Sequence, residues 1–253
     1  MNLFVRTVED QGRFDVAVVI VTLIRPSLEK AVESVFTQNF AGRVQILIGV
    51  DKPEGTWLLL EQLQRRAPAN QVVSVLYPGY ATSVRHGGIY PSLDGGCLRT
   101  VLSFLANAFH VAYLDDDNWW EEKHLSSLIH SISGYQFACS QRWLVDELTR
   151  QPICIDKWHS TGCEPSMLPG MEKGFSDPSS LMIDKRRCSF LLPHWSAGPA
   201  DTADRAFFKS LTEHLEGTDT HQATSYYVIR RDNVLWPLIA ADPALSTMAK
   251  RGK

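Results

Sequence analysis

The sequence predicts an open α/β fold with a mostly parallel sheet flanked by helices. Short, continuous apolar runs rich in β-branched residues, such as residues 16–22, are typical of strands that are buried on both faces. These runs alternate with segments whose apolar residues recur at helical spacing, as in residues 28–36. Polar residues follow the ends of the runs, and open α/β sheets bind their ligands beyond the carboxyl ends of the strands. We therefore expect a functional site along that edge of the sheet.

The composition is that of one globular domain spanning residues 1–253. Hydrophobic residues make up 44% of the chain and charged residues 21%, which excludes a disordered or fibrous protein. The net charge of −3, without a dense basic run, argues against a broad surface for binding nucleic acid. Five cysteines, an odd number, predict free thiols in a reducing compartment. No apolar run approaches the roughly 18–20 residues of a membrane span, and no basic-then-apolar leader is present, so we expect a cytoplasmic protein without a transmembrane segment.

The first elements follow from residues 16–22, a predicted strand, and from the break at Arg25-Pro26-Ser27. Pro and Ser suit a helix start, and the apolar residues after them recur at helical spacing. A second strand over residues 45–50 ends at Asp51. Further along, residues 57–66 predict a Leu-rich helix and residues 72–77 a third strand.

A third helix and a fourth strand complete the regular half of the chain. Gly95-Gly96 precedes an apolar stripe at helical spacing, which consists of Leu98, Val101, Leu102, Leu105 and Phe109. Residues 111–114 then predict a strand. Four strands therefore alternate with three helices, as in a parallel sheet.

The pattern is less regular in the second half. An amphipathic helix is expected near Leu125 and Leu128, and residues 134–178, rich in Pro, Gly and Trp, are expected to be irregular with small strands. The tail after Pro243 is expected to be loose. Three more elements are expected: a strand at 181–183, a helix through Phe207, Leu211 and Leu215, and a strand at 226–230.

Three consecutive carboxylates, Asp115, Asp116 and Asp117, follow the predicted strand over residues 111–114. Charges this close repel one another, so they are tolerated mainly where water or a hard cation neutralises them. Asp115 and Asp117 are two positions apart, so in an extended segment they point to the same side and could share one Mg²⁺ or Mn²⁺. The alternative is a turn in which an Asp caps a helix that begins at Trp119.

Three motifs in the first half agree in order and spacing with one known family. Residues 18–26 (Val-Val-Ile-Val-Thr-Leu-Ile-Arg-Pro), with Glu33-Ser34-Val35 in the following helix, are similar to the strand and helix that open these chains. Val50-Asp51 resembles the Val-Asp-Asp that ends their second strand. Leu98-Arg99, with Arg99 16 residues before Asp115, resembles the Ala-Arg-Asn that opens one of their helices. The chain thus resembles family 2 glycosyltransferases, well from about residue 16 to 120 and more weakly to about residue 230.

The resemblance implies a GT-A-like fold that moves a sugar from a nucleoside diphosphate sugar to an acceptor hydroxyl of a glycan, lipid or protein, with inversion. Residues of about 14–120 would form the nucleotide-sugar-binding half and residues of about 121–240 the acceptor and catalytic half. The residues that match donor-binding positions are Thr22, Arg25, Asp51, Arg99, Asp115 and Asp116. The implied ligands of Mn²⁺ or Mg²⁺ are Asp117, Asp115 and His221.

Inverting transfer needs a base that removes the acceptor's proton. The family places an Asp at the start of a late helix, and Asp204 matches this position, although Ala203 replaces the usual preceding Glu. Asp201 is the competing candidate, and Asp201 with Asp204 also fits a helix cap. Cys154, His159 and Cys163 have spacings that a zinc site could use, but no fourth ligand is evident, so free thiols and a surface histidine are expected.

Two other functions remain open on the sequence. A catalytically inactive, glycosyltransferase-like module that binds nucleotide or sugar fits the missing Glu and the altered residues at the strand ends. A nucleotidyltransferase that makes nucleotide sugars uses a similar sheet, but it usually carries a Gly-rich phosphate loop after the first strand. Residues 23–26 lack such a loop.

Overall fold

The apolar runs of the first half form four parallel strands. In the computed structural model, which describes residues 12–91, 95–168, 172–197 and 203–245, β1 pairs in parallel with its two neighbours, and β2 pairs in parallel with β3. The strands are β1 (Phe14–Thr22), β2 (Val44–Val50), β3 (Gln71–Leu76) and β4 (Ala108–Asp115). Their carboxyl ends therefore lie along one edge of the sheet.

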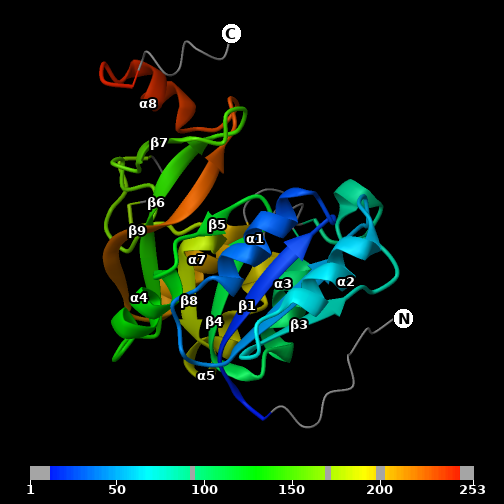
Figure 1. Cartoon of the computed structure of the whole chain (residues 1–253). Coiled ribbons are helices and arrows are strands. Elements are labelled where there is room, and N and C mark those ends of the chain that lie inside the picture. Colours follow the sequence, from blue (N-terminus) through cyan, green and yellow to red (C-terminus); the bar gives the residue numbers. More distant parts are fainter. Residues whose placement is uncertain (1–11, 92–94, 169–171, 198–202, 246–253) are drawn as a thin grey trace.

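Alternate residues of β1 enter two different cores, which is why this strand is apolar throughout. Val18 and Ile20 share a core with α1 (Ser27–Phe36), α2 (Trp57–Arg66) and α4 (His124–Ser131). Ala17 and Val19 share the other core with α3 (Gly96–Leu105), α6 (His194–Ala197) and α7 (Ala203–His214). The sheet is thus the middle of three layers (Figure 1).

The second half continues the same sheet with mixed pairing. β8 (Leu181–Asp184) lies antiparallel between β4 and β6 (Phe137–Asp146). β9 (Gly217–Ile229) runs parallel to β6, and β5 (Trp119–Trp120) pairs with β9. The strand order is β3-β2-β1-β4-β8-β6-β9-β5, with β7 (Pro152–Ile155) on β6. The predicted open, mostly parallel sheet with flanking helices is confirmed, and its antiparallel pairs belong to this half.

A third, smaller core extends the molecule beyond the main sheet. The far ends of β6 and β9, with β7 and α8 (Trp236–Ala241), project from the rest of the fold in Figure 1. Leu144, Ile229 and Ile239 are fully buried there. Short elements complete the chain: α5 (Lys185–Cys188), η1 (Val84–His86), η2 (Pro178–Ser180) and η3 (Ser189–Leu191).

Some predictions for individual elements were wrong. α3 ends at Leu105, so Phe109 lies in β4, and Val101 and Leu105 are 40% and 56% exposed because only the Leu98 and Leu102 side of the stripe meets the sheet. No helix begins at Trp119: Asp116 and Asp117 form a turn that leads into β5, which excludes the helix-cap alternative.

Residues 134–178 contain the ten-residue strand β6 instead of small strands alone. α8 was not predicted, and most of the tail expected to be loose lies outside the described residues.

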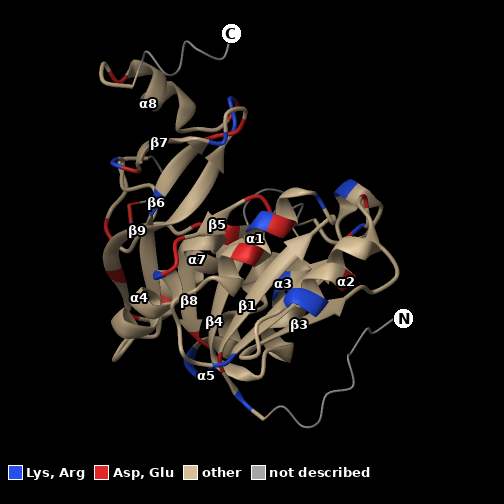
Figure 2. Ribbon diagram, in the orientation of Figure 1, with Lys and Arg blue, Asp and Glu red and all other residues tan. Residues whose placement is uncertain are grey.

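Charged side chains lie mainly on helices, turns and strand ends, while the strands of the sheet are largely uncharged (Figure 2). β4 illustrates this arrangement, since it is uncharged from Ala108 until Asp115, its last residue. Among the described residues, no helix combines the length and the hydrophobicity needed to cross a membrane.

Candidate active site

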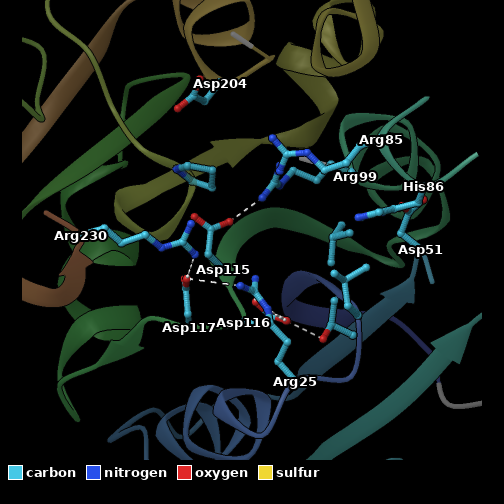
Figure 3. Close-up of a pocket in the computed structure, with 15 residues that line it drawn as sticks. Arg25, Asp51, Arg85, His86, Arg99, Asp115, Asp116, Asp117, Asp204 and Arg230 are labelled. Atoms are coloured by element: carbon cyan, nitrogen blue, oxygen red, sulfur yellow. Dashed lines mark hydrogen bonds and ion pairs between the residues drawn. The ribbon is translucent and has the colours of Figure 1, made fainter. Parts of the chain in front are cut away.

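A cavity of about 280 Å³ lies where the carboxyl ends of β1, β2 and β4 meet the start of α7. Its walls come from segments that are far apart in the sequence, as Figure 3 shows. Eight of the nine side chains that the sequence singled out line it: Thr22, Arg25, Asp51, Arg99, Asp115, Asp116, Asp117 and Asp204. The parallel strands therefore deliver the predicted residues to one place.

Thr22 and Asp116 form a buried support for Arg25. The Thr22 hydroxyl donates to Asp116 Oδ2 (2.6 Å) and accepts from the Ile24 backbone N–H (2.8 Å). The Arg25 guanidinium contacts both oxygens of Asp116. Burial raises the pKa of Asp116, and Arg25 and Thr22 oppose that rise. The ion pair holds Arg25 at the cavity wall, where it can meet an anion.

Asp115 is paired with Arg99, which extends from the first turn of α3. Burial raises the pKa of Asp115 to about 7, although the Arg99 charge opposes the shift. The neighbouring acids Asp117 and Asp116 also raise this pKa. The Asp115 carboxyl is therefore poised to ionise fully once a further positive charge enters the cavity.

Asp117 is about as accessible as Asp115, but its charged partners are more distant. Its Oδ2 lies 3.4 Å from Arg230 and 3.7 Å from Arg25, and its side chain is 24% exposed. Carboxylate oxygens are the ligands that Mg²⁺ and Mn²⁺ prefer, and such ions keep several positions for phosphate or water. Asp117 together with Asp115 fits this chemistry, because the long ion pairs of Asp117 leave it able to exchange partners.

Asn118 ties the turn after β4 to two other elements. Its amide N–H donates to Ser179 Oγ (2.9 Å), and its oxygen accepts from the Val228 backbone N–H (2.9 Å). A carboxylate could not donate the first of these bonds. This residue therefore fixes the turn that carries Asp116 and Asp117, and it is 2% exposed.

Asp51 organises the loop that follows β3. Its Oδ1 accepts from the Thr82 backbone N–H (2.7 Å) and its Oδ2 lies 2.9 Å from His86 Nδ1. These contacts place His86 and Arg85, both in η1, beside the cavity. The sequence analysis missed both residues, as it missed Arg230 at the end of β9.

Asp204 lies in the first turn of α7, across the cavity from the three consecutive acids (Figure 3). Its Oδ1 accepts from the Arg205 backbone N–H at 2.7 Å. Asp204 also lines a second cavity of about 150 Å³, together with Asp115 and Pro178. It therefore stands where the two cavities meet. The competing candidate Asp201 lies outside the described residues.

The structure does not bring His221 to this site. His221 is exposed in β9 and has a φ of 54°. Burial raises the pKa of Asp219, and the nearby His221 opposes that rise. His221 does not line the cavity. In the sheet, β8 and β6 separate β9 from β4, and His221 lies in β9 at a register shift with β6, not at the strand end that reaches the cavity.

Comparison with known proteins identifies the fold. No family model and no curated protein matches the sequence. Residues 1–349 of TarS from S. aureus match with a TM-score of 0.60 and 14% identity, over 85% of this chain and 60% of that one. The complex of the same fragment with UDP-GlcNAc has a TM-score of 0.60 and 12% identity, over 87% and 60% of the two chains.

A second solved structure is a mannosyltransferase from Pyrobaculum calidifontis in complex with GDP-Man and Mn²⁺. It matches with a TM-score of 0.58 and 10% identity, over 89% of this chain and 60% of that one. The chain thus has the GT-A fold of glycosyltransferases, as the sequence resemblance predicted. It spans about 60% of the length of these structures.

Proposed function

We propose that this protein is a metal-dependent, inverting glycosyltransferase that uses a nucleoside diphosphate sugar as donor. The observation that carries the proposal is the cavity at the strand ends, where Asp115 and Asp117 lie among arginines from separate segments and Asp204 lies across the cavity from them (Figure 3). The GT-A fold supports it, since structures with this fold are described in complex with UDP-GlcNAc and with GDP-Man and Mn²⁺.

The first half, residues of about 14–120, would hold the donor. Arg25, Arg99 and Arg230 line the cavity from three different elements, and arginine offers a charged, forked set of donors to phosphate oxygens. Asp51 and the η1 loop that it organises would accommodate the nucleoside. Thr22 and Asp116 would act by positioning Arg25, because their own polar atoms already bond within the protein.

Asp115 and Asp117 would hold the divalent cation, Mn²⁺ or Mg²⁺. When bound, the ion supplies neutralising charge to the departing diphosphate. The chain itself orients the diphosphate through its arginines and keeps Asp115 beside Arg99 in the position that the cation requires.

Asp204 would act as the base on the acceptor side, formed by residues of about 121–240. As the acceptor oxygen bonds to the anomeric carbon, the bond from that carbon to the diphosphate breaks, and the hydroxyl proton moves to the Asp204 carboxylate. Attack from the face opposite the diphosphate inverts the anomeric centre. The second cavity, which shares Asp204 with the first, would admit the acceptor.

Substitution of Asp117 by Asn tests the proposal. The variant keeps the shape of the side chain and loses its charge, so we expect Mn²⁺-dependent release of nucleoside diphosphate from donor sugars to fall by at least about 100-fold, the usual effect of losing one charge-stabilising group. Glu61→Gln, on the exposed face of α2, removes the same charge elsewhere and should leave the rate unchanged.

The assay uses a panel of UDP-, GDP-, ADP-, CDP- and dTDP-sugars, and circular dichroism verifies that both variants are folded. Equal rates for Asp117→Asn and the parent would refute the role of Asp117. Nucleotide binding without any turnover would favour the inactive binding module, and formation of a nucleotide sugar from nucleoside triphosphate would favour the nucleotidyltransferase.

A further inference from the structure

A second cluster of metal-ligating side chains lies outside the cavity at the ends of β1, β2 and β4, which we call the donor cavity. Cys139 in β6, Cys163 in the loop after β7 and Asp219 in β9 each offer one ligand atom, and these atoms all lie within 4.8 Å of one another. Cys139 is fully buried, and the other two are half-buried. None of the three lines the donor cavity, so the proposed glycosyl transfer gives them no role.

The backbone holds these residues together from three separate segments. An isolated bridge joins Gly162 and Phe175, with N–H···O distances of 2.6 and 3.0 Å, and so fixes the loop next to Cys163. The Cys163 backbone N–H donates to both oxygens of Asp219, at 3.0 and 3.1 Å. Metal ligands are commonly oriented by such hydrogen bonds from neighbouring groups.

A bulge in β9 lies next to the cluster. Cys139 pairs with Asp219 and Gln141 with Ala223, so three residues of β9 (220–222) lie opposite the single residue Ser140 of β6. This bulge carries His221, whose φ of 54° is uncommon for a side-chain-bearing residue. Bulges redirect side chains and are frequent next to functional sites. Here the bulge follows directly on Asp219 and holds an imidazole near it.

The ligand atoms of this cluster indicate which metal ion it would bind. Two sulfur atoms exclude Mg²⁺ and Ca²⁺, which take oxygen ligands, and are typical of Zn²⁺ sites that combine Cys with His or carboxylate. A disulfide between Cys139 and Cys163 would not involve the Asp219 carboxylate, whereas a bound cation would contact all three side chains. Zinc in structural sites is four-coordinate, and a water molecule would complete the tetrahedron.

We propose that Cys139, Cys163 and Asp219 bind a structural Zn²⁺ ion that fixes the loop residues 156–168 and 172–177 to strands β6 and β9. The same loop supplies Ser160, Leu168 and Phe175 to the second cavity. The ion would therefore shape the acceptor side of the molecule without contacting the donor. The proposed zinc site is independent of the proposed activity and can be tested without any substrate.

The experiment measures Zn²⁺ binding to the reduced, metal-free full chain by equilibrium dialysis, and the thiolate-to-cobalt absorption after Co²⁺ is substituted. We expect one tight Zn²⁺ per chain. Loss of an outer partner of a zinc ligand costs about 10- to 100-fold in affinity, so loss of a ligand in Cys163→Ser should cost more than about 100-fold. Asp219→Asn is a second variant, because it retains both thiols.

Two controls separate this site from other metal binding. Cys154→Ser removes a half-buried thiol of β7 that lies outside the cluster, and it should leave affinity and cobalt absorption unchanged. Asp117→Asn disables the donor cavity and should also leave them unchanged. The proposal is overturned if Cys163→Ser binds Zn²⁺ as the parent does, if Asp117→Asn abolishes the tight binding, or if the parent binds no Zn²⁺ and instead forms a Cys139–Cys163 disulfide in air.

Discussion

The three consecutive acids at the end of β4 differ in what surrounds each of them. Asp116 is fully buried and contacts Arg25 and Thr22, so it stabilises the wall of the cavity. Asp115 is paired with Arg99, and Asp117 has only long ion pairs. One run of like charges thus contains one residue that supports the cavity wall and two to which we assign the proposed cation. The surrounding arginines make this division, and the cation site at Asp115 and Asp117 stays a prediction.

The raised pKa of Asp115 predicts a pH-dependent stability. A carboxyl whose pKa rises from 3.8 when unfolded to about 7 when folded binds its proton more tightly in the folded state. It therefore favours folding at low pH, and this contribution is lost as pH rises from about 4 to 7. Between about pH 4 and 7, the unfolding free energy of the metal-free protein should fall relative to that of Asp115→Asn by up to about 1.4 kcal/mol per pH unit. Above pH 7 the difference in unfolding free energy between the two proteins should stay constant.

Urea unfolding at a series of pH values measures this difference for the two proteins. The amide of Asp115→Asn changes the contact with Arg99, and this change contributes the same amount to the unfolding free energy at every pH. The test is therefore how the difference in unfolding free energy between the two proteins varies with pH, and not the size of that difference at any one pH. Parallel stability curves for the two proteins would mean that Asp115 titrates in the folded state as it does in the unfolded chain.

Asp204 gives a second prediction at this scale. The proposed base would act on the acceptor and would not hold the donor, so Asp204→Asn should lower transfer by about 10²- to 10⁴-fold and leave the Kd for nucleotide unchanged. Transfer assays paired with calorimetric titration of the nucleotide separate the two effects. Glu213→Gln, exposed near the end of the same helix, is the matched control. Full transfer activity in Asp204→Asn would assign the proton to another group.

At the scale of the element, α3 begins where the backbone must pass very close to β1. Gly95 caps this helix with a φ of 76°, and a Cβ placed there would lie 2.3 Å from Val21 Cγ1. Glycine alone permits both the left-handed backbone and this approach. The first turn of α3 carries Arg99, so the close packing of this helix end sets the position of an arginine that faces the donor cavity.

Gly95→Ala is therefore expected to be more destabilising than a left-handed backbone alone explains. Gly134 has a similar φ of 90° but open space around its Cβ position, so Gly134→Ala should cost only about 1–2 kcal/mol. Gly95→Ala adds steric overlap, worth about 1–3 kcal/mol more, and should also weaken nucleotide binding through Arg99. Urea denaturation of the two variants gives the comparison, and equal losses would show that Val21 moves aside freely.

The elements of the first half could be predicted because each reflects a local pattern. β1, β2 and β4 are apolar runs, and their last residues point to the site by topology alone. The same rule, applied to the last strand, would also have found Arg230. Arg85 and His86 could not be found in this way, because their loop is held by the contacts of Thr82 and His86 with Asp51, which is 35 residues before His86.

The second half was harder to predict because long-range pairing overrides local propensity. β6 contains Arg142, a residue that does not suggest a buried strand, yet it is 3% exposed. Two carboxylates make this burial tolerable: Asp156 lies 3.1 Å from Arg142 Nε and Asp177 lies 2.8 Å from its Nη1. Those partners are 14 and 35 residues away, so no window of sequence around β6 could reveal them.

At the scale of the whole molecule, the two halves meet around one polar edge. The first half supplies Arg25, Arg99 and the three consecutive acids, while Asp204 and Arg230 come from the second. Both cores lie behind this edge, so the cavity is framed by rigid strands and helix ends. A ligand that contacts both halves should therefore stabilise the whole fold when it binds.

This arrangement predicts that nucleotide and cation stabilise the protein cooperatively. A ligand at 100 times its Kd adds about 2.7 kcal/mol to the unfolding free energy, which raises the Tm of a chain of this size by about 5–10 °C. One nucleoside diphosphate among UDP, GDP, ADP, CDP and dTDP should give such a shift with Mn²⁺. The shift should exceed the sum of the separate shifts, because in the proposed site the diphosphate and the carboxylates of Asp115 and Asp117 would share the ion.

Thermal unfolding of the parent, Asp117→Asn and Glu61→Gln with each nucleotide, with and without Mn²⁺, measures this cooperativity. Asp117→Asn should keep the smaller shift due to nucleotide alone, because the arginines remain, and should lose the additional shift due to Mn²⁺. Glu61→Gln should behave as the parent. Purely additive shifts in the parent would mean that cation and nucleotide bind apart from each other, and the shared site at the end of β4 would then be wrong.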